Sequence, residues 1–227
     1  MRGVPGLMVE WLGRVPYAEA LEVQAQAVEE RSLGLSGDRL LLLEHPPVVT
    51  LGRSASPGNL RLSRERLLER GIEVHSIARG GDVTYHAPGQ LVGYLLVDLG
   101  SRGERDLHLF LRRMESTLIE ALGRVGLSTR RIEGRTGVFM KAEEEDPDAM
   151  IHPRKIASIG VGVRRWITFH GFALNVTNGL DGFEVIIPCG LPDVEMTSVA
   201  EELGSGPLGL DARMRSEIRA SFERAFA

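Results

Sequence analysis

The sequence has one cysteine in 227 residues, at position 189. It can therefore form no internal disulfide, and it offers no cysteine pair for a zinc site. It also lacks any apolar run near the roughly 20 residues that a membrane-spanning helix needs. Its opening residues lack the apolar core of a signal peptide. We therefore expect a cytoplasmic protein with a reduced thiol and no membrane association.

Neither sign of charge dominates, and lysine is scarce. The formal net charge is -4, which argues against a nucleic-acid-binding protein, because such proteins usually present a strongly basic face. Of the 27 basic residues 25 are arginine, and only Lys141 and Lys155 are lysines. A lysine retained in such a chain favours a chemical role, because lysine can release its proton when buried and arginine cannot.

Apolar spacing predicts helices and strands in alternation, with no internal repeat. Helices are expected at 16–31, 62–71 and 107–122; a capping-box pattern from Ser198 to Glu201 opens another, and Met214, Ile218 and Phe222 mark the last. Strands are expected at 39–45, 72–77, 83–86, 91–97, 137–140, 156–163, 167–176 and 183–187. Short turns between consecutive strands indicate antiparallel pairing. The pattern predicts one α+β domain spanning 1–227, with a mixed, mainly antiparallel sheet flanked by helices.

The single cysteine lies in "IIPCGL", directly after the strand expected at 183–187. Free cysteine is usually a buried, small apolar residue, which favours a packing role. Pro188 ends the strand because it has no N–H, and Gly190 leaves bare backbone that a ligand can approach. The local pattern therefore leaves packing and catalysis equally open for Cys189.

Two glycine-bearing segments predict a ligand site. In "ARGGDVTYHAPGQLVGYLLVDL" Arg79 supplies a cation beside Gly80 and Gly81, which suits an anion or a carbonyl group, although a glycine-rich hairpin is the alternative. The spacing matches neither a phosphate-binding P-loop nor a dinucleotide fingerprint. In "KIASIGVGVRRWITFHGFALNV" glycines within apolar strands leave backbone bare, which can wall a ligand slot.

Two further features are weaker. The histidines at 45, 86 and 170 lack metal-ligand spacing, so no metal is expected. The acidic stretch 141–155 contains two prolines and no apolar period, which is typical of a surface loop. Whether that loop is a lid or only a solvated linker stays open.

Taken together and in this order, several motifs closely resemble those of the lipoyl(octanoyl) transferases of lipoate biosynthesis. They are "EHPPVVTLGR", "RGGDVTYHAPGQLVGY", "GRTGVFM", "KIASIGVGVRRWITFHGFALNV" and "IIPCGL", and the likeness covers most of residues 10–205. The resemblance implies a fold shared with biotin and lipoate protein ligases. It also implies transfer of an octanoyl group from acyl carrier protein to a lysine of apo lipoyl domains. These acceptor domains are those of 2-oxoacid dehydrogenases and the glycine cleavage H protein. The resemblance further implies a monomer that needs no cofactor.

The resemblance also implies the site residues. It assigns the acyl-thioester cysteine to Cys189 and the catalytic lysine to Lys155. The substrate-contacting positions that it implies are Arg79, Gly80, Gly81, Asp82, Val83, Thr84, Tyr85, His86, Ser158, Ile159, Gly160, Gly171, Phe172 and Ala173. Asp82 stands where the family usually has glutamine, and Ala87 stands where it usually has glycine, so the local charge at Asp82 differs from the family pattern.

Thiol and lysine chemistry agrees with that assignment. A free thiol with a pKa of about 8.5 is only partly ionised at neutral pH, and a neighbouring cation or base such as Lys155 raises the thiolate fraction. Attack on a thioester exchanges one thioester for another, so no nucleotide is needed. Two alternatives stay open: an ATP-dependent lipoate or biotin type ligase in which Cys189 is structural, and a non-catalytic acyl-protein binding module. A papain-like protease is disfavoured because every histidine precedes the cysteine.

Overall fold

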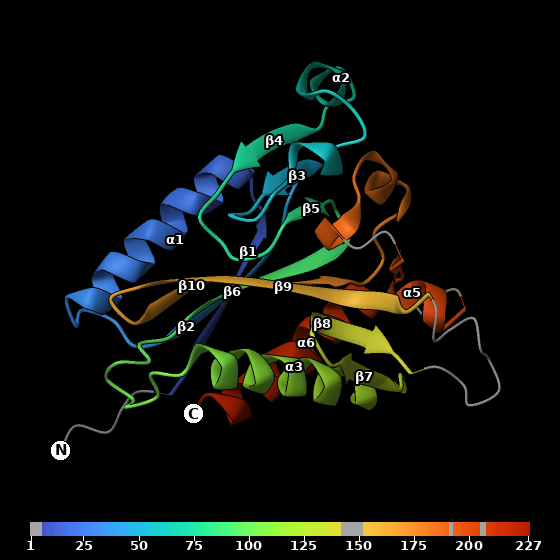
Figure 1. Ribbon diagram of the computed structural model, residues 1–227. Coiled ribbons are helices and arrows are strands. Elements are labelled where there is room, and N and C mark those ends of the chain that lie inside the picture. The colour runs from blue at the N-terminus through green and yellow to red at the C-terminus, as the bar shows by residue number, and fades with distance from the viewer. Residues whose placement is uncertain (1–5, 142–151, 191–192, 205–207) are drawn as a thin grey trace.

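The computed structural model describes residues 6–141, 152–190, 193–204 and 208–227, apart from the side chains of Pro57 and Cys189. Its main sheet runs in the order β1-β2-β6-β10-β9-β8-β7, with β11 added beside β9 (Figure 1). The strands are β1 Met8–Arg14, β2 Arg39–Glu44, β6 Gln90–Leu96, β7 Thr129–Ile132, β8 Arg135–Met140, β9 Arg154–Arg164, β10 Ile167–Asn175 and β11 Glu195–Met196. The pairs β1·β2 and β11·β9 are parallel and the remaining pairs of this sheet are antiparallel.

Helices cover both faces of the main sheet because successive strand residues point to opposite sides. On β2, Leu40 and Leu42 pack with the helices α3 Leu107–Arg124 and α6 Leu210–Ala225. Leu41 and Leu43 pack instead with Ala20 and Ala27 of α1 Tyr17–Ser32. The alternation explains why "RLLLLE" is apolar throughout: β2 is buried on both faces.

A second, three-stranded sheet lies on the α1 side of the main sheet (Figure 1). Its order is β4-β3-β5, made of β3 Val48–Leu51, β4 Glu73–Ser76 and β5 Val83–His86. The helix α2 Arg64–Glu69 and the 3-10 helix η2 Asp181–Val185 share its apolar cluster. This small sheet matters for function because β5 faces the strands β9 and β10 across a cavity.

The expected helices are confirmed to within two residues at most ends. Ser198 caps the short helix α5 Val199–Glu202, because its hydroxyl accepts a hydrogen bond from the N–H of Glu201 at 3.2 Å. The expected mixed, mainly antiparallel sheet is also confirmed. The sequence pattern did not predict the strands β1, β3, β7 and β11. The strand β1 lies at the sheet edge and exposes two apolar residues, so its apolar and polar residues do not alternate clearly between a buried and an exposed face.

The strand expected at 183–187 is wrong. These residues form most of η2, followed by a single bridge between Ile186 and Leu60. The ring of Tyr85 occupies the space beside Gly182, and a Cβ on Gly182 would lie only 2.0 Å from that ring. The chain therefore bends closely around Tyr85. Phe183 and Val185 are buried as expected, but in a 3-10 turn. Apolar content alone did not distinguish the two conformations.

Within the described residues no helix combines the length and the hydrophobicity needed to cross a membrane. The surface loop expected at 141–155 falls mostly on residues 142–151, which lie outside the described part of the chain.

Candidate active site

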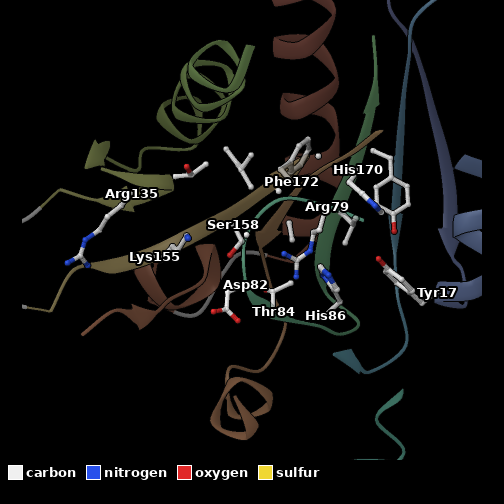
Figure 2. A pocket seen from close by; sticks show the side chains of 18 of the residues that line it. Tyr17, Arg79, Asp82, Thr84, His86, Arg135, Lys155, Ser158, His170 and Phe172 are labelled. Atoms are coloured by element: carbon white, nitrogen blue, oxygen red, sulfur yellow. The ribbon is translucent and has the colours of Figure 1, made fainter. Parts of the chain in front are cut away.

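A cavity of about 250 Å³ lies between the small sheet and the strands β8, β9 and β10 of the main sheet (Figure 2). Its walls come from segments far apart in the sequence. They include Tyr17 on α1, the loop and strand around Arg79 to His86, Val92 and Tyr94 on β6, Gly134 to Thr136 at β8, and parts of β9 and β10. Lys155 and Arg135 lie on one side of the view, and His170 and Tyr17 on the other.

Lys155 is held rigidly on β9 and is only 2 % exposed. Its backbone is paired with Met196, and its carbonyl oxygen accepts a hydrogen bond from the N–H of Thr197 at 3.0 Å. The ammonium lies 5.4 Å from the ring centre of Phe139. A lysine so enclosed has little rotamer freedom, which keeps its amine directed at the cavity it lines.

Gly137 makes room for that lysine. A Cβ on Gly137 would lie 2.5 Å from Cε of Lys155 and 2.7 Å from the carbonyl oxygen of Ala157, and its φ of +129° disfavours any other residue. Its N–H donates to Oε1 of the buried Glu115 at 3.0 Å. Two arginines, Arg112 at 2.7 Å and Arg131 at 3.1 Å, neutralise that carboxylate. The glycine of "GRTGVFM" therefore shapes the slot for Lys155.

The segment after Arg79 is fixed against both sheets. Arg79 is 8 % exposed, and its Nη2 donates to the carbonyl and to the hydroxyl oxygen of Thr50, both at 2.9 Å. The N–H of Gly80 donates to the carbonyl of Val161 on β9 at 2.8 Å. A Cβ on Gly160 would lie 2.9 Å from the carbonyl oxygen of Gly80, so the close approach of the two backbones requires glycine there.

The turn that carries Cys189 is held from the small-sheet side. Cys189 lies within the 3-10 turn η3 Pro188–Gly190, and its side chain is outside what the structure describes. The N–H of Ile187 donates to the carbonyl of Asn59 at 2.9 Å. The amide of Asn59 in turn donates to Oδ2 of Asp82 at 2.6 Å. Gly190 adopts a φ of +66°, and a Cβ there would lie 2.7 Å from that same oxygen. Asp82, a cavity residue, thus abuts the cysteine turn.

Neutral aromatic rings line the side of the cavity opposite Lys155. Burial lowers the pKa of His86 to about 3 and that of His170 to about 4, with the charge of Arg79 adding to both effects. Behind them, burial also lowers the pKa of His45 to about 4; its Nε2 lies 2.8 Å from the hydroxyl of Tyr94. Because these rings are uncharged at neutral pH, this part of the cavity can accept an apolar group.

The structure brings most of the predicted site residues to this cavity. Those that line it are Arg79, Gly81, Asp82, Thr84, His86, Lys155, Ser158, Ile159, Gly160, Gly171, Phe172 and Ala173. Gly80 contributes through its backbone bond to β9. Val83 and Tyr85 instead face the apolar cluster of the small sheet, as alternation along β5 requires.

Sequence reasoning assigned no substrate contact to several cavity residues. They are Tyr17, Val92, Tyr94, Gly134, Arg135, Thr136 and His170. All but Tyr17 belong to motifs that carried the family resemblance, so the signal was present. Within its motif, Val92 has the pattern of an ordinary apolar strand residue. Nothing near Tyr17 marks it, because α1 reaches the cavity only in the folded chain.

Comparisons with known proteins agree on the family. Residues 16–222 match the lipoyl protein ligase A/B catalytic domain. The chain is 50% identical over 212 residues to an octanoyltransferase of Syntrophotalea carbinolica, covering 93% of this chain and 90% of that one. It is 46% identical over 222 residues to an octanoyltransferase of Acidobacterium capsulatum, covering 95% and 88%.

The fold has solved counterparts as well. A bi-partite lipoate protein ligase from Thermoplasma acidophilum superposes with a TM-score of 0.72 at 16% identity, covering 97% of this chain and 83% of that one. At this identity the likeness concerns the fold alone, and it confirms the expectation of a fold shared with lipoate protein ligases.

Proposed function

This chain belongs to the octanoyltransferases of the lipoyl protein ligase A/B catalytic family, and we propose that it works through a Cys189 and Lys155 pair. The donor is octanoyl-acyl carrier protein, the acceptor is a lysine of an apo lipoyl domain, and the octanoyl group passes through a thioester on Cys189. The observation that carries the proposal is that Lys155 and Asp82 line one cavity, and Asp82 abuts the turn of Cys189.

In the first step the Cys189 thiolate attacks the thioester carbon of the donor. A new carbon–sulfur bond forms, the bond to the carrier's sulfur breaks, and that thiolate takes up a proton. Lys155 favours the Cys189 thiolate as a nearby cation and supplies the proton to the departing thiol. Because one thioester replaces another, this step needs no nucleotide.

In the second step the amine of the acceptor lysine attacks the acyl-enzyme. A carbon–nitrogen bond forms, the bond to Cys189 breaks, and the proton of the attacking amine passes to Lys155, which acts as general base. Backbone N–H groups stabilise the oxyanion in both steps. The apolar tail lies along Ile159, Phe172 and Ala173, toward the neutral histidines.

An ATP-dependent ligase is the alternative, and the fold likeness to a lipoate protein ligase favours it. The two functions differ in their requirements. The transferase modifies an apo lipoyl domain when given octanoyl-acyl carrier protein without ATP, and a Cys189→Ser variant fails to do so. A ligase uses free octanoate and requires ATP. Modification that appears only with ATP and free octanoate would reject the transferase mechanism for this chain.

A further inference from the structure

A second cavity, of about 370 Å³, lies beside the candidate site. Its walls are α1, the residues that follow β4, and the hairpin that joins β9 to β10. Leu21, Ala25, Val28, Ile77, Ile167 and Phe169 supply the apolar part of its lining, and Glu29, Arg164 and Arg165 supply charged groups. Among the residues described for both cavities, His170 is the one that lines each of them. Its imidazole approaches a residue of each cavity, Gln24 of the second and Tyr94 of the first.

His170 is fixed in this position by its backbone and by its neighbours. It has a φ of +59°, a conformation rare for a residue other than glycine, in the middle of β10. Its N–H donates to Oε1 of the buried Gln24 on α1, and its Nδ1 lies 3.4 Å from Nε2 of the same side chain. Its ring stands edge-on to Tyr94, with ring centres 6.0 Å apart. A strained backbone held by specific contacts points to a functional constraint.

A variant without the imidazole can keep the local backbone. The bond from the backbone N–H of His170 to Gln24 does not involve the imidazole, so a glycine at this position can still form it. Glycine adopts a positive φ without strain, so a His170→Gly chain can keep the path of β10. Removal of the ring frees volume beside both the cavity of about 250 Å³ and the cavity of about 370 Å³.

We propose that His170 is the specificity-determining residue that limits the length of the acyl chain, because it closes the candidate site against the second cavity. This inference rests on the proposed function, in which the octanoyl tail extends away from Lys155. The wild-type wall accommodates the octanoyl tail and rejects chains four or six carbons longer. Without the ring, these longer chains enter the second cavity.

The experiment compares octanoyl, decanoyl, dodecanoyl and tetradecanoyl carrier proteins as donors to an apo lipoyl domain. We expect His170→Gly to raise the ratio of kcat/KM for dodecanoyl over octanoyl at least about 10-fold, the lower end of what one methylene changes in an apolar pocket. Leu21→Ala is the matched control, because Leu21 lines only the second cavity. It enlarges that space without opening the wall, so the ratio stays at the wild-type value.

A double variant separates opening of the wall from general loosening. Adding Leu21→Phe to His170→Gly fills part of the second cavity and should return the ratio toward the wild-type value. If His170→Gly does not fold, His170→Asn replaces it, because asparagine is smaller and tolerates a positive φ. An unchanged ratio in a folded variant that still transfers octanoate overturns the inference. Absence of octanoyl transfer by the wild-type protein overturns the proposed function instead.

Discussion

Replacing Lys155 by arginine distinguishes a proton acceptor from a fixed positive charge. Both side chains carry charge, but only lysine releases and regains a proton readily, so Lys155→Arg keeps the charge and removes the proposed base. Loss of a general base typically slows a reaction 10² to 10⁴-fold, which corresponds to roughly 3 to 5 kcal/mol of transition-state stabilisation. We expect single-turnover amide formation to fall by that factor.

Packing around Lys155 also sets the expected loss of stability in the Lys155→Arg variant. Lys155 is 2 % exposed, and the space beside its Cε is closed by the backbone of β8 at Gly137. The larger guanidinium must displace neighbours, and overpacking of this kind costs about 1 to 3 kcal/mol. The variant is therefore less stable but still folded at low temperature, which circular dichroism and urea unfolding measure. Under the proposed mechanism we expect acylation of Cys189 to persist in part, because arginine also favours a thiolate.

The other lysine of the chain supplies the control. Lys141 is exposed directly after β8, and Lys141→Arg should change neither stability nor transfer. Amide formation at the wild-type rate in folded Lys155→Arg would refute the base assignment and leave Lys155 as an electrostatic support.

Three further predictions concern the slot, the histidines and docking. Gly137→Ala should destabilise the protein by about 1 to 3 kcal/mol and reduce transfer, because the new Cβ would lie 2.5 Å from Cε of Lys155. Gly123→Ala on α3 is the control, because no atom lies within 4 Å of its Cβ, and it should neither destabilise the protein nor reduce transfer. Urea unfolding and transfer assays measure the two effects. Folding lowers the pKa of His45 and of His170 from 6.5 to about 4. As the pH falls, these histidines therefore bind protons in the unfolded state before they do so in the folded state. The free energy of unfolding should fall between pH 6.5 and pH 4, by about 1.4 kcal/mol per pH unit for each histidine. Unfolding midpoints that stay constant between pH 7 and pH 5 would contradict this. The exposed Arg53, Arg164 and Arg165 should dock acidic protein substrates, so added salt should raise KM more than it changes kcat; steady-state kinetics insensitive to ionic strength would rule this out.

The sequence predicted much of the architecture, for reasons that particular residues illustrate. Leu107 to Leu122 repeats apolar residues at three and four positions, and α3 packs that face on the sheet. Residues 83–86 were correctly expected to form a strand. That Thr84 and His86 face the cavity follows only from the pairing of this strand with β3. The strand expected at 183–187 failed because the prediction depended on apolar content, and the burial of Phe183 against Tyr85 occurs here in a 3-10 turn.

The candidate site divides in the same way. Lys155 and the segment after Arg79 were named from motifs, and they line one cavity. Tyr17 and the relation of His170 to a second cavity were not predictable, because both depend on where α1 lies against β10. The contact of Asp82 with Asn59 and its approach to Gly190 also arise from chain crossings that no local pattern encodes.

Intact mass spectrometry after incubation with octanoyl-acyl carrier protein, without ATP and without an acceptor, detects the proposed acyl-enzyme itself. We expect a mass increase of one octanoyl group, located on Cys189 by peptide mapping. The increase should be absent in Cys189→Ser and should be removed by hydroxylamine, which cleaves thioesters. The adduct should also disappear, with matching modification of the acceptor, when an apo lipoyl domain is added. An unmodified enzyme that nonetheless turns over, or an adduct on another residue, would contradict the proposed mechanism.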